Sequence, residues 1–226
     1  MPASCDVFLI DGFSLLYRSY YGYPSNLTTP SGVPINAVYG FITLMLNAIE
    51  TYQPRYVGIC MDRKDPTYRH ELFPEYKAHR SPPDDEFLVQ LPEFRRLMTA
   101  FNIPLFELSG YESDDLLGTI ARLCSEQSLT TYIMSGDLDL LQLITDSTFI
   151  ITNKKGNAYI CDADAVKERY ALLPNQIIDY KALKGDASDN IPGVKGVGDK
   201  TAVKLLLEYQ SLDGVYDHIS DISSKS

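Results

Sequence analysis

Val7-Phe8-Leu9-Ile10-Asp11-Gly12 is an unbroken apolar run that ends in an acid and a glycine. Such a run predicts a strand buried on both faces, as in a parallel sheet, followed by a tight turn. Residues 56–61 repeat the pattern before Asp62, and residues 132–134 do so shortly before Asp137. Acids at the carboxyl ends of parallel strands meet at one edge of the sheet. The sequence therefore predicts an acidic cavity at that edge.

The chain alternates predicted strands and helices up to about residue 162. After the first strand these are helices over 37–52, 91–101 and 112–126, strands over 56–61, 103–106 and 132–134, and a hairpin over 148–152 and 157–161 around Lys154-Lys-Gly-Asn157. Such alternation is typical of α/β proteins with a mostly parallel central sheet covered by helices. We therefore predict an α/β core over residues 1–162.

The pattern becomes all-helical after residue 162. The predicted helices cover 163–170, 175–183, 199–209 and 212–219. We predict a helical subdomain over 163–219, and the Ser-rich tail 220–226 is expected to fray. Residues 63–83 form a long, polar and weakly periodic connection of the kind that is usually functional or mobile. We therefore expect a mobile segment at about 63–90 within the core.

Nine acids form the candidate metal site. They are Asp11, Asp62, Glu112, Asp114, Asp115, Asp137, Asp139, Asp186 and Asp189. Each alone could cap a helix or shape a turn, but converging carboxylates repel strongly unless cations neutralise them. Such oxygen ligands suit Mg²⁺ or Mn²⁺, and a pair of these ions commonly acts on phosphate esters. The presence of all nine acids together therefore favours a metal-dependent phosphodiesterase.

Overall composition does not exclude a nucleic-acid partner. Acids outnumber Lys and Arg by 30 to 20, which gives a net charge of −10, and the nine candidate ligands account for almost all of this excess. The four cysteines form no Cys-x-x-Cys pair, so zinc is disfavoured and buried, reduced thiols are expected. The sequence shows neither a signal peptide nor an apolar run long enough to span a bilayer. We expect a cytoplasmic, nucleoid-associated protein without a membrane partner.

The glycine- and lysine-rich segment between residues 185 and 207 is a candidate phosphate-binding element. Its glycines permit tight turns and close backbone approach, and amides at the start of the following helix can point at a phosphate. The candidate DNA-binding residues here are Gly193, Lys195, Gly196, Gly198, Lys200, Thr201 and Lys204. Backbone amides and lysines offer little base readout, which favours sequence-independent binding. The alternative is a plain helical hairpin with glycine caps.

Residues 63–80 interleave basic and aromatic side chains, among them Arg69, Tyr76, Lys77 and Arg80. Aromatic rings stack on unpaired bases while cations hold phosphates, so this segment is a candidate binder of single-stranded ends. A solvated loop with a few aromatic anchors is the alternative. Arg18 follows the first acid and could reach the same cavity, although alone it fits a surface helix charge equally well.

Together these residues resemble the 5′-nuclease domain of bacterial DNA polymerase I, within the flap-endonuclease superfamily. The matching motifs run in the family's order over nearly the whole chain. They are Leu9-Ile-Asp-Gly12, Ala37-Val-Tyr-Gly-Phe41, Met61-Asp62, Tyr68-Arg-His70, Tyr76-Lys77 with Arg80, Gly110-Tyr-Glu-Ser-Asp-Asp115, the stretch from Ser135 to Leu143, and Gly185-Asp-Ala-Ser-Asp-Asn-Ile-Pro-Gly193 onward. The last is the most specific, because it resembles the family's helix-three-turn-helix.

The resemblance implies a PIN-like 5′-nuclease core and specific roles for these residues. Asp11, Asp62, Glu112, Asp114 and Asp115 match the acids at a first metal, and Asp137, Asp139, Asp186 and Asp189 match those at a second. The metals would be two or more Mg²⁺, which Mn²⁺ can replace, with K⁺ as a candidate at the helix-three-turn-helix. Lys77 and Arg80 match basic residues at the base of a helical arch that a single-stranded 5′ end passes through, and with Arg18 they are the candidate catalytic residues.

The activity implied is a structure-specific 5′→3′ exonuclease and 5′-flap endonuclease of replication and repair. Its substrates would be DNA with a 5′ flap, nick or 5′ end, and RNA–DNA hybrids. The resemblance also implies a monomer, either the N-terminal domain of DNA polymerase I or a stand-alone homologue that works with a polymerase. One alternative is a catalytically weak module that binds flaps or junctions, which the intact acid set argues against. A PIN-type RNase is the other, and it would lack the glycine-lysine hairpin.

Overall fold

The structure is a computed structural model that describes residues 4–154 and 157–222. Its centre is a six-stranded sheet with strand order β3-β2-β1-β4-β5-β6, in which only β6 is antiparallel to its neighbour. The strands are β1 (Val7–Asp11), β2 (Tyr56–Cys60), β3 (Leu105–Phe106), β4 (Thr131–Met134), β5 (Thr148–Lys154) and β6 (Asn157–Cys161). The predicted mostly parallel sheet is confirmed.

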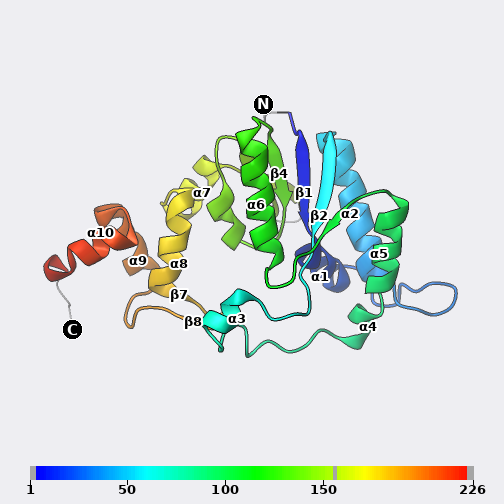
Figure 1. The fold of residues 1–226 in the computed structure, drawn as a ribbon, viewed down its shortest axis with the longest axis horizontal. Helices are drawn as coiled ribbons and strands as arrows, with labels where there is room; N and C mark the ends of the chain where they lie inside the picture. Colours follow the sequence, from blue (N-terminus) through cyan, green and yellow to red (C-terminus); the bar gives the residue numbers. More distant parts are fainter. Residues whose placement is uncertain (1–3, 155–156, 223–226) are drawn as a thin grey trace.

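Helices cover both faces of this sheet (Figure 1). In the core they are α1 (Gly12–Gly22), α2 (Asn36–Tyr52), α3 (Tyr68–Leu72), α4 (Asp85–Leu88), α5 (Leu91–Ala100), α6 (Ser113–Glu126), the 3-10 helix η1 (Asp139–Leu143) and α7 (Ala163–Tyr170). After α7 come η2 (Pro174–Gln176), α8 (Ile177–Lys184), the paired strands β7 (Gly185–Asp186) and β8 (Ile191–Pro192), α9 (Asp199–Tyr209), α10 (Leu212–Asp217) and η3 (Ile219–Asp221).

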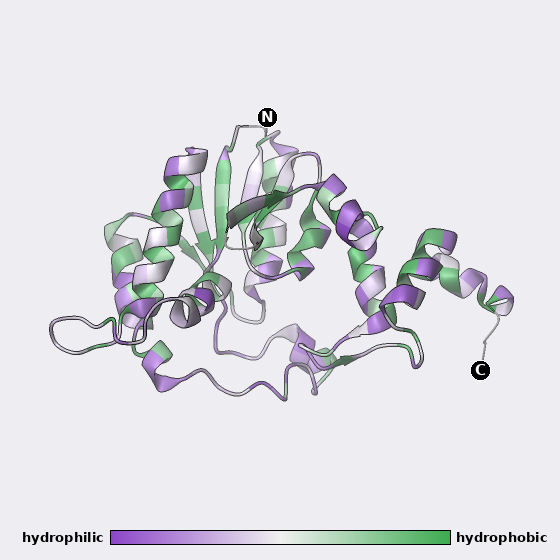
Figure 2. Ribbon diagram, turned by 180° about the vertical axis from the view of Figure 1, so that it is seen from behind, coloured by the Kyte–Doolittle hydropathy of each residue, from purple (hydrophilic) through white to green (hydrophobic). Residues whose placement is uncertain are grey.

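Strand β1 is buried on both faces, as its apolar run predicted. Phe8 and Ile10 pack into a cluster with residues of α1, α2 and α5. Val7 and Leu9 point the other way, into a second cluster with residues of α6, η1 and α7. Figure 2 shows the apolar residues concentrated on the strands and on the inward sides of the helices. Because both faces are covered, chemistry is confined to the sheet's edges.

The helical part after α7 has a small core of its own. Leu172, Tyr180 and Leu183 pack against Ala202 and Leu206, which joins α8 to α9. The predicted helices over 163–170 and 199–209 match α7 and α9 in full, and the others agree to within a few residues. Part of the predicted frayed tail forms η3, and residues 223–226 lie outside the described chain. The turn of the predicted hairpin, residues 155–156, is likewise not described.

Several elements of this fold were not predicted, among them α3, α4 and η1, and two such features bear on the site. The tight turn expected after β1 is instead the start of α1, because Asp11 Oδ1 accepts a hydrogen bond from the Ser14 amide at 3.2 Å and caps the helix. The second is the antiparallel pair β7–β8, which interrupts a region predicted to be all-helical. Its strands are too short to carry an apolar pattern of their own.

The segment 63–90 crosses below the carboxyl edge of the sheet, from α3 near β7–β8 to α4 near α5 (Figure 1). Tyr76 is buried midway along the segment, and Phe87 is fully buried near its C-terminal end. The Phe87 ring stacks on Tyr17 with centroids 4.3 Å apart. The segment is thus anchored at two points, and the mobility expected for it remains a prediction.

All four cysteines carry free thiols, and three of them are buried. Along the described chain, 4–154 and 157–222, every helix is too short or too polar to cross a bilayer.

Gly193 directly follows β8, and its backbone lies close to that of Lys184, which directly precedes β7. Replacing Gly193 tests how much this close approach contributes to stability. A Cβ at this position would lie 2.2 Å from the carbonyl carbon and oxygen of Lys184. We expect Gly193→Ala to lower the free energy of unfolding by about 2 kcal/mol, the usual cost of overpacking. Gly198→Ala is the control, because a Cβ there meets nothing within 4 Å. Thermal unfolding followed by circular dichroism measures both, and equal Tm values would contradict the prediction.

Candidate metal centre and nucleic-acid interface

Three parallel strands deliver acids to one edge of the sheet. Asp11 ends β1, Asp62 lies two residues beyond β2, and Asp137 lies three beyond β4. Register places Asp11 opposite Cys60 and Ile10 opposite Met134, so these three strands end at about the same level. The parallel pairing therefore converges side chains that are far apart in sequence, as the strand pattern predicted.

A cavity of about 940 Å³ opens at this edge, and six of the nine predicted acids line it. They are Asp11, Asp62, Glu112, Asp114, Asp137 and Asp139. Lys77, Arg80 and Lys181 line the same cavity, together with an apolar wall that includes Phe13 and Leu88. Acids from β1, β2, β4 and the start of α6 therefore share one space with five cationic side chains, since Arg63 and Lys64 also line it.

Burial and mutual repulsion shape the acids at the centre. Burial raises the pKa of Asp11 to about 6, against hydrogen bonds from Ser135 and Ser14 that lower it. The Ser135 hydroxyl donates to Asp11 Oδ2 at 2.6 Å. The pKa of Asp114 is raised to about 8, first by burial and then by the charges of Asp11, Asp137 and Asp62. The neighbouring carboxylates therefore oppose the ionisation of Asp114.

Backbone amides fix two of the other acids. Asp62 Oδ1 accepts from the Ser113 amide at 2.7 Å, which ties the end of β2 to the first turn of α6. Asp137 is exposed, and its Oδ1 accepts from the Asp139 amide at 2.8 Å. Both carboxylates are therefore oriented by local structure.

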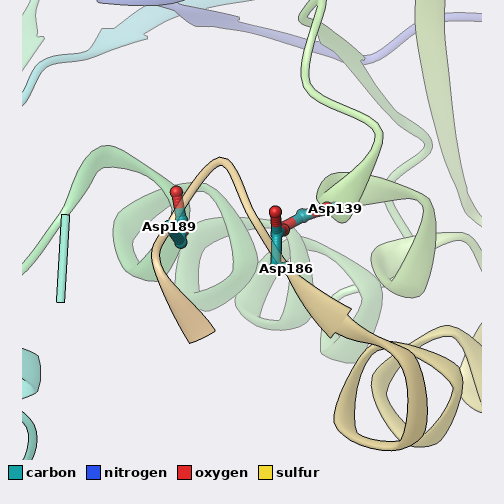
Figure 3. A group of neighbouring side chains, drawn as sticks. All are labelled: Asp139, Asp186 and Asp189. Carbon is teal, nitrogen blue, oxygen red and sulfur yellow. The ribbon is translucent and has the colours of Figure 1, made fainter. Parts of the chain in front are cut away.

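A second group of acids comprises Asp139, Asp186 and Asp189. One carboxylate oxygen of each lies within 4.8 Å of the others, and they are the three described residues with this ligand spacing. Figure 3 shows Asp139 on η1 meeting Asp186 and Asp189 on the β7–β8 turn. Lys181 Nζ lies 2.5 Å from both Asp139 Oδ1 and Asp186 Oδ2. Although burial alone would lower the pKa of Lys181, its hydrogen bonds to these two acids raise it.

Basic and phenolic groups from the 63–90 segment hold other acids. Lys77 Nζ donates to both oxygens of Glu112 at 3.0 Å, and the Tyr76 hydroxyl donates to Glu112 and Asp189 at 3.0 and 3.1 Å. Arg80 lies 2.5 Å from Asp189 Oδ1. Lys77 has φ +54°, and its amide donates to the Asp189 carbonyl at 3.0 Å. This hydrogen bond stabilises a left-handed backbone conformation that is unfavourable for lysine, and such strain is common at functional sites.

The structure separates three predicted site residues from the central cavity. Arg69 donates to both oxygens of Asp115 at 2.7 and 2.9 Å, and this pair lines a different cavity of about 600 Å³ along α6. Arg18 lies on α1 and is not one of the described residues that line the central cavity. Asp115 was predicted to be a metal ligand, Arg69 a DNA contact and Arg18 a catalytic residue. Their positions give these predicted roles no support.

The candidate phosphate-binding residues all lie exposed in the turn before α9 and in its first turns. Gly196 has φ +85°, which favours glycine. Gly198 caps α9 with ordinary extended backbone, and nothing lies within 4 Å of its Cβ position, so its use is to leave the helix amides open. Lys195, Lys200 and Lys204 are exposed around it. The predicted arrangement of open amides beside lysines is present.

Sequence reasoning missed two contributors to the site. Ser135 holds the carboxylate of Asp11, and a serine after a strand carries no distinctive signal. Lys181 was not among the predicted site residues. Its position near the end of a helix, five residues before Asp186, is a signal that could have suggested the contact.

Comparison with known proteins identifies the family. Residues 6–171 match the 5′-3′ exonuclease N-terminal resolvase-like domain, and residues 172–226 match the 5′-3′ exonuclease C-terminal SAM fold. A 5′-3′ exonuclease of Bacillus subtilis is 39% identical over 217 residues, which cover 94% of this chain and 73% of that protein. The chain belongs to the 5′-3′ exonuclease family.

Members of this exonuclease family occur within larger proteins. DNA polymerase I of Caldicellulosiruptor bescii is 42% identical over 220 residues, covering 96% of this chain and 26% of the polymerase. The chain thus spans about a quarter of the length of that relative.

Solved structures support the fold. A T5 5′-exonuclease with zinc ions bound has a TM-score of 0.80 at 24% identity, covering 98% of this chain and 81% of that one. The catalytic core of Rad2 in complex with DNA has a TM-score of 0.60 at 18% identity, covering 96% and 66%. At these identities the similarity establishes the arrangement of elements alone.

The raised pKa values of Asp11 and Asp114 predict how the stability of the metal-free protein responds to pH. Their ordinary value of 3.8 becomes about 6 and about 8 in the folded protein, so the folded state holds more protons than the unfolded state above pH 4. The free energy of unfolding should therefore fall as pH rises from about 5 to about 8. Asp114→Asn should be more stable than the wild type near pH 8 and similar near pH 5.

Urea unfolding in EDTA at several pH values measures this difference. Asp164→Ala, which removes an exposed acid on α7, serves as the control and should leave the pH dependence unchanged. Parallel stability curves for Asp114→Asn and the wild type would show that Asp114 ionises normally.

Proposed function

We propose that this chain is a structure-specific 5′→3′ exonuclease and 5′-flap endonuclease that hydrolyses phosphodiesters with the help of Mg²⁺. The observation that carries the proposal is the convergence of six acids from separate elements in one cavity, beside Lys77 and Arg80. Family membership supports the reaction class. The proposed substrate is DNA with a 5′ end, at a flap or a nick.

The residues present fit a pair of hard divalent ions. The candidate ligands are all carboxylate oxygens, which Mg²⁺ and Mn²⁺ prefer. Asp11 and Asp114 resist ionisation beside other acids, and Asp139 shares an ammonium group with Asp186. Acids that outnumber the cations around them in this way gain from divalent cations. Asp11, Asp62, Glu112 and Asp114 are proposed for one ion, and Asp137, Asp139, Asp186 and Asp189 for the other. Asp115 could join the ligands of the first ion only if its ion pair with Arg69 were broken.

Bound divalent ions would activate a water and neutralise charge on the scissile phosphate. The chain's own residues do the rest. Lys77 and Arg80 stand at the cavity wall, where they can offset charge that develops on phosphate oxygens. Ser135 keeps the carboxylate of Asp11 in place.

Positioning of the substrate is assigned to the two segments that flank the cavity. The 63–90 segment crosses the carboxyl edge, so a single strand that reaches the acids must pass it (Figure 1). The exposed amides and lysines before α9 would hold the backbone of the adjoining duplex, with K⁺ as a candidate bridging ion. Cleavage of RNA–DNA hybrids, action as a monomer beside or fused to a polymerase, and a place at the nucleoid belong to the same proposal.

Asp137→Ala tests the metal assignment. We expect cleavage of a labelled 5′-flap substrate in Mg²⁺ to fall at least about 100-fold, the order contributed by one charged group at such a transition state. Duplex binding measured in Ca²⁺ should change little. Asp146→Ala, which removes an exposed acid outside the cavity lining, is the matched control. Turnover by Asp137→Ala at the wild-type rate would refute the assignment.

Lys195→Ala and Lys200→Ala test the phosphate-binding role of the turn before α9. Each lysine that contacts a phosphate adds about 0.9 to the slope of log affinity against log salt for B-DNA. We therefore expect each substitution to weaken duplex binding for every sequence and to reduce the slope by about 1. Lys167→Ala, an exposed lysine on α7, is the control. Unchanged salt slopes, measured by fluorescence anisotropy, would place the duplex elsewhere.

A further inference from the structure

Lys181 is a cavity-lining cation to which the proposed function gives no task. It lies on α8 and reaches the second acid group from the helical side. Its ammonium is 2.5 Å from one oxygen of Asp139 and 2.5 Å from one oxygen of Asp186. These two acids come from elements more than 40 residues apart, η1 and β7. Lys181 therefore bridges the two halves of the second acid group.

The third member of this group is neutralised differently. Asp189 pairs with Arg80 and accepts from the Tyr76 hydroxyl. Lys181 is thus the cation shared by Asp139 and Asp186, and the oxygens it contacts belong to the acids proposed to hold a divalent ion. An ammonium and a divalent ion that use the same oxygens compete, because each needs the negative charge that the other neutralises.

We propose that Lys181 is the internal counter-ion of the second acid group in the metal-free protein, and that a divalent ion binds there by displacing its ammonium. This inference rests on the proposed function, in which those acids are metal ligands. The released side chain lies at the wall of the cavity, where a phosphate-bearing substrate would meet it. Lys181 would thus stabilise the acid group in the absence of metal, and its ammonium would move away when a divalent ion binds.

Lys184 provides a matched control on the same helix. Its ammonium pairs with Asp199 at 2.8 Å and with the Tyr180 hydroxyl at 3.3 Å, away from the acid group. Lys184→Met therefore removes the same charge and the same side chain from α8 without touching Asp139 or Asp186. Lys181→Arg keeps a competing cation in place.

Mn²⁺ titration of the full 226-residue chain by calorimetry tests the competition. We expect Lys181→Met to bind Mn²⁺ at one class of site about tenfold more tightly than the wild type, a difference of about 1.4 kcal/mol. Lys184→Met and Lys181→Arg should bind as the wild type does, and Asp186→Asn should lose that class of site. In EDTA, Lys181→Met should have a lower Tm than Lys184→Met and a larger rise in Tm with Mn²⁺.

The outcomes separate the two proposals. If the folded wild type does not bind Mn²⁺, the proposed function itself is refuted. Wild-type uptake with equal or weaker binding by Lys181→Met would leave that function standing and refute the displacement.

A measurement on the unaltered chain covers the case in which Lys181→Met does not fold without metal. Amine acetylation, followed by mass spectrometry of peptides, reports how accessible each lysine is. Addition of Mg²⁺ should raise the acetylation rate of Lys181 several-fold and leave that of Lys184 unchanged. A Lys181 rate that stays constant while Mg²⁺ binds would overturn the inference.

Discussion

Repulsion among carboxylates at the carboxyl edge of the sheet is the constraint around which this molecule is organised. Parallel pairing of β1, β2 and β4 brings the acids together, and no apolar packing can relieve charges of one sign. Cationic side chains from other segments neutralise these acids. Arg69 and Lys77 come from the 63–90 segment and Lys181 from α8, and they hold Asp115, Glu112 and the second acid group.

These ion pairs also connect parts of the chain that share little apolar surface. Helix α3 has no buried residue, and the helical part after α7 has its own small core. The 63–90 segment and the β7–β8 turn meet through polar contacts, such as Arg80 with Asp189 and the Asn190 amide with the Glu75 carbonyl. Partly exposed ion pairs contribute modestly to stability. They are therefore contacts that a metal or a phosphate can exchange without unfolding the core.

The β7–β8 turn gives the molecule a fixed spacing between two kinds of chemistry. Asp186 and Asp189 lie at one end of a short stretch, and the open amides around Gly198 lie at the other. Within this stretch the backbone of Gly193 approaches that of Lys184 closely. A duplex held by exposed lysines would then have its backbone at a set distance from the acids, whatever its base sequence. Such geometry would select a substrate by its shape.

The sequence by itself determined the α/β class, the order of the main strands and helices, and six acids that share the cavity. Apolar runs and helical spacing are local signals, and an acid directly after a buried strand can point only to the sheet's edge. The helix-capping role of Asp11 was one of two alternatives, since a cap looks like a turn, and the β7–β8 pair escaped because two-residue strands have no period. Only the tertiary structure decided which cation meets which acid. The pairing of Arg69 with Asp115, the absence of Arg18 from the cavity lining and the bridge made by Lys181 depend on side-chain reach across elements distant in sequence, and local patterns carry no information about that reach.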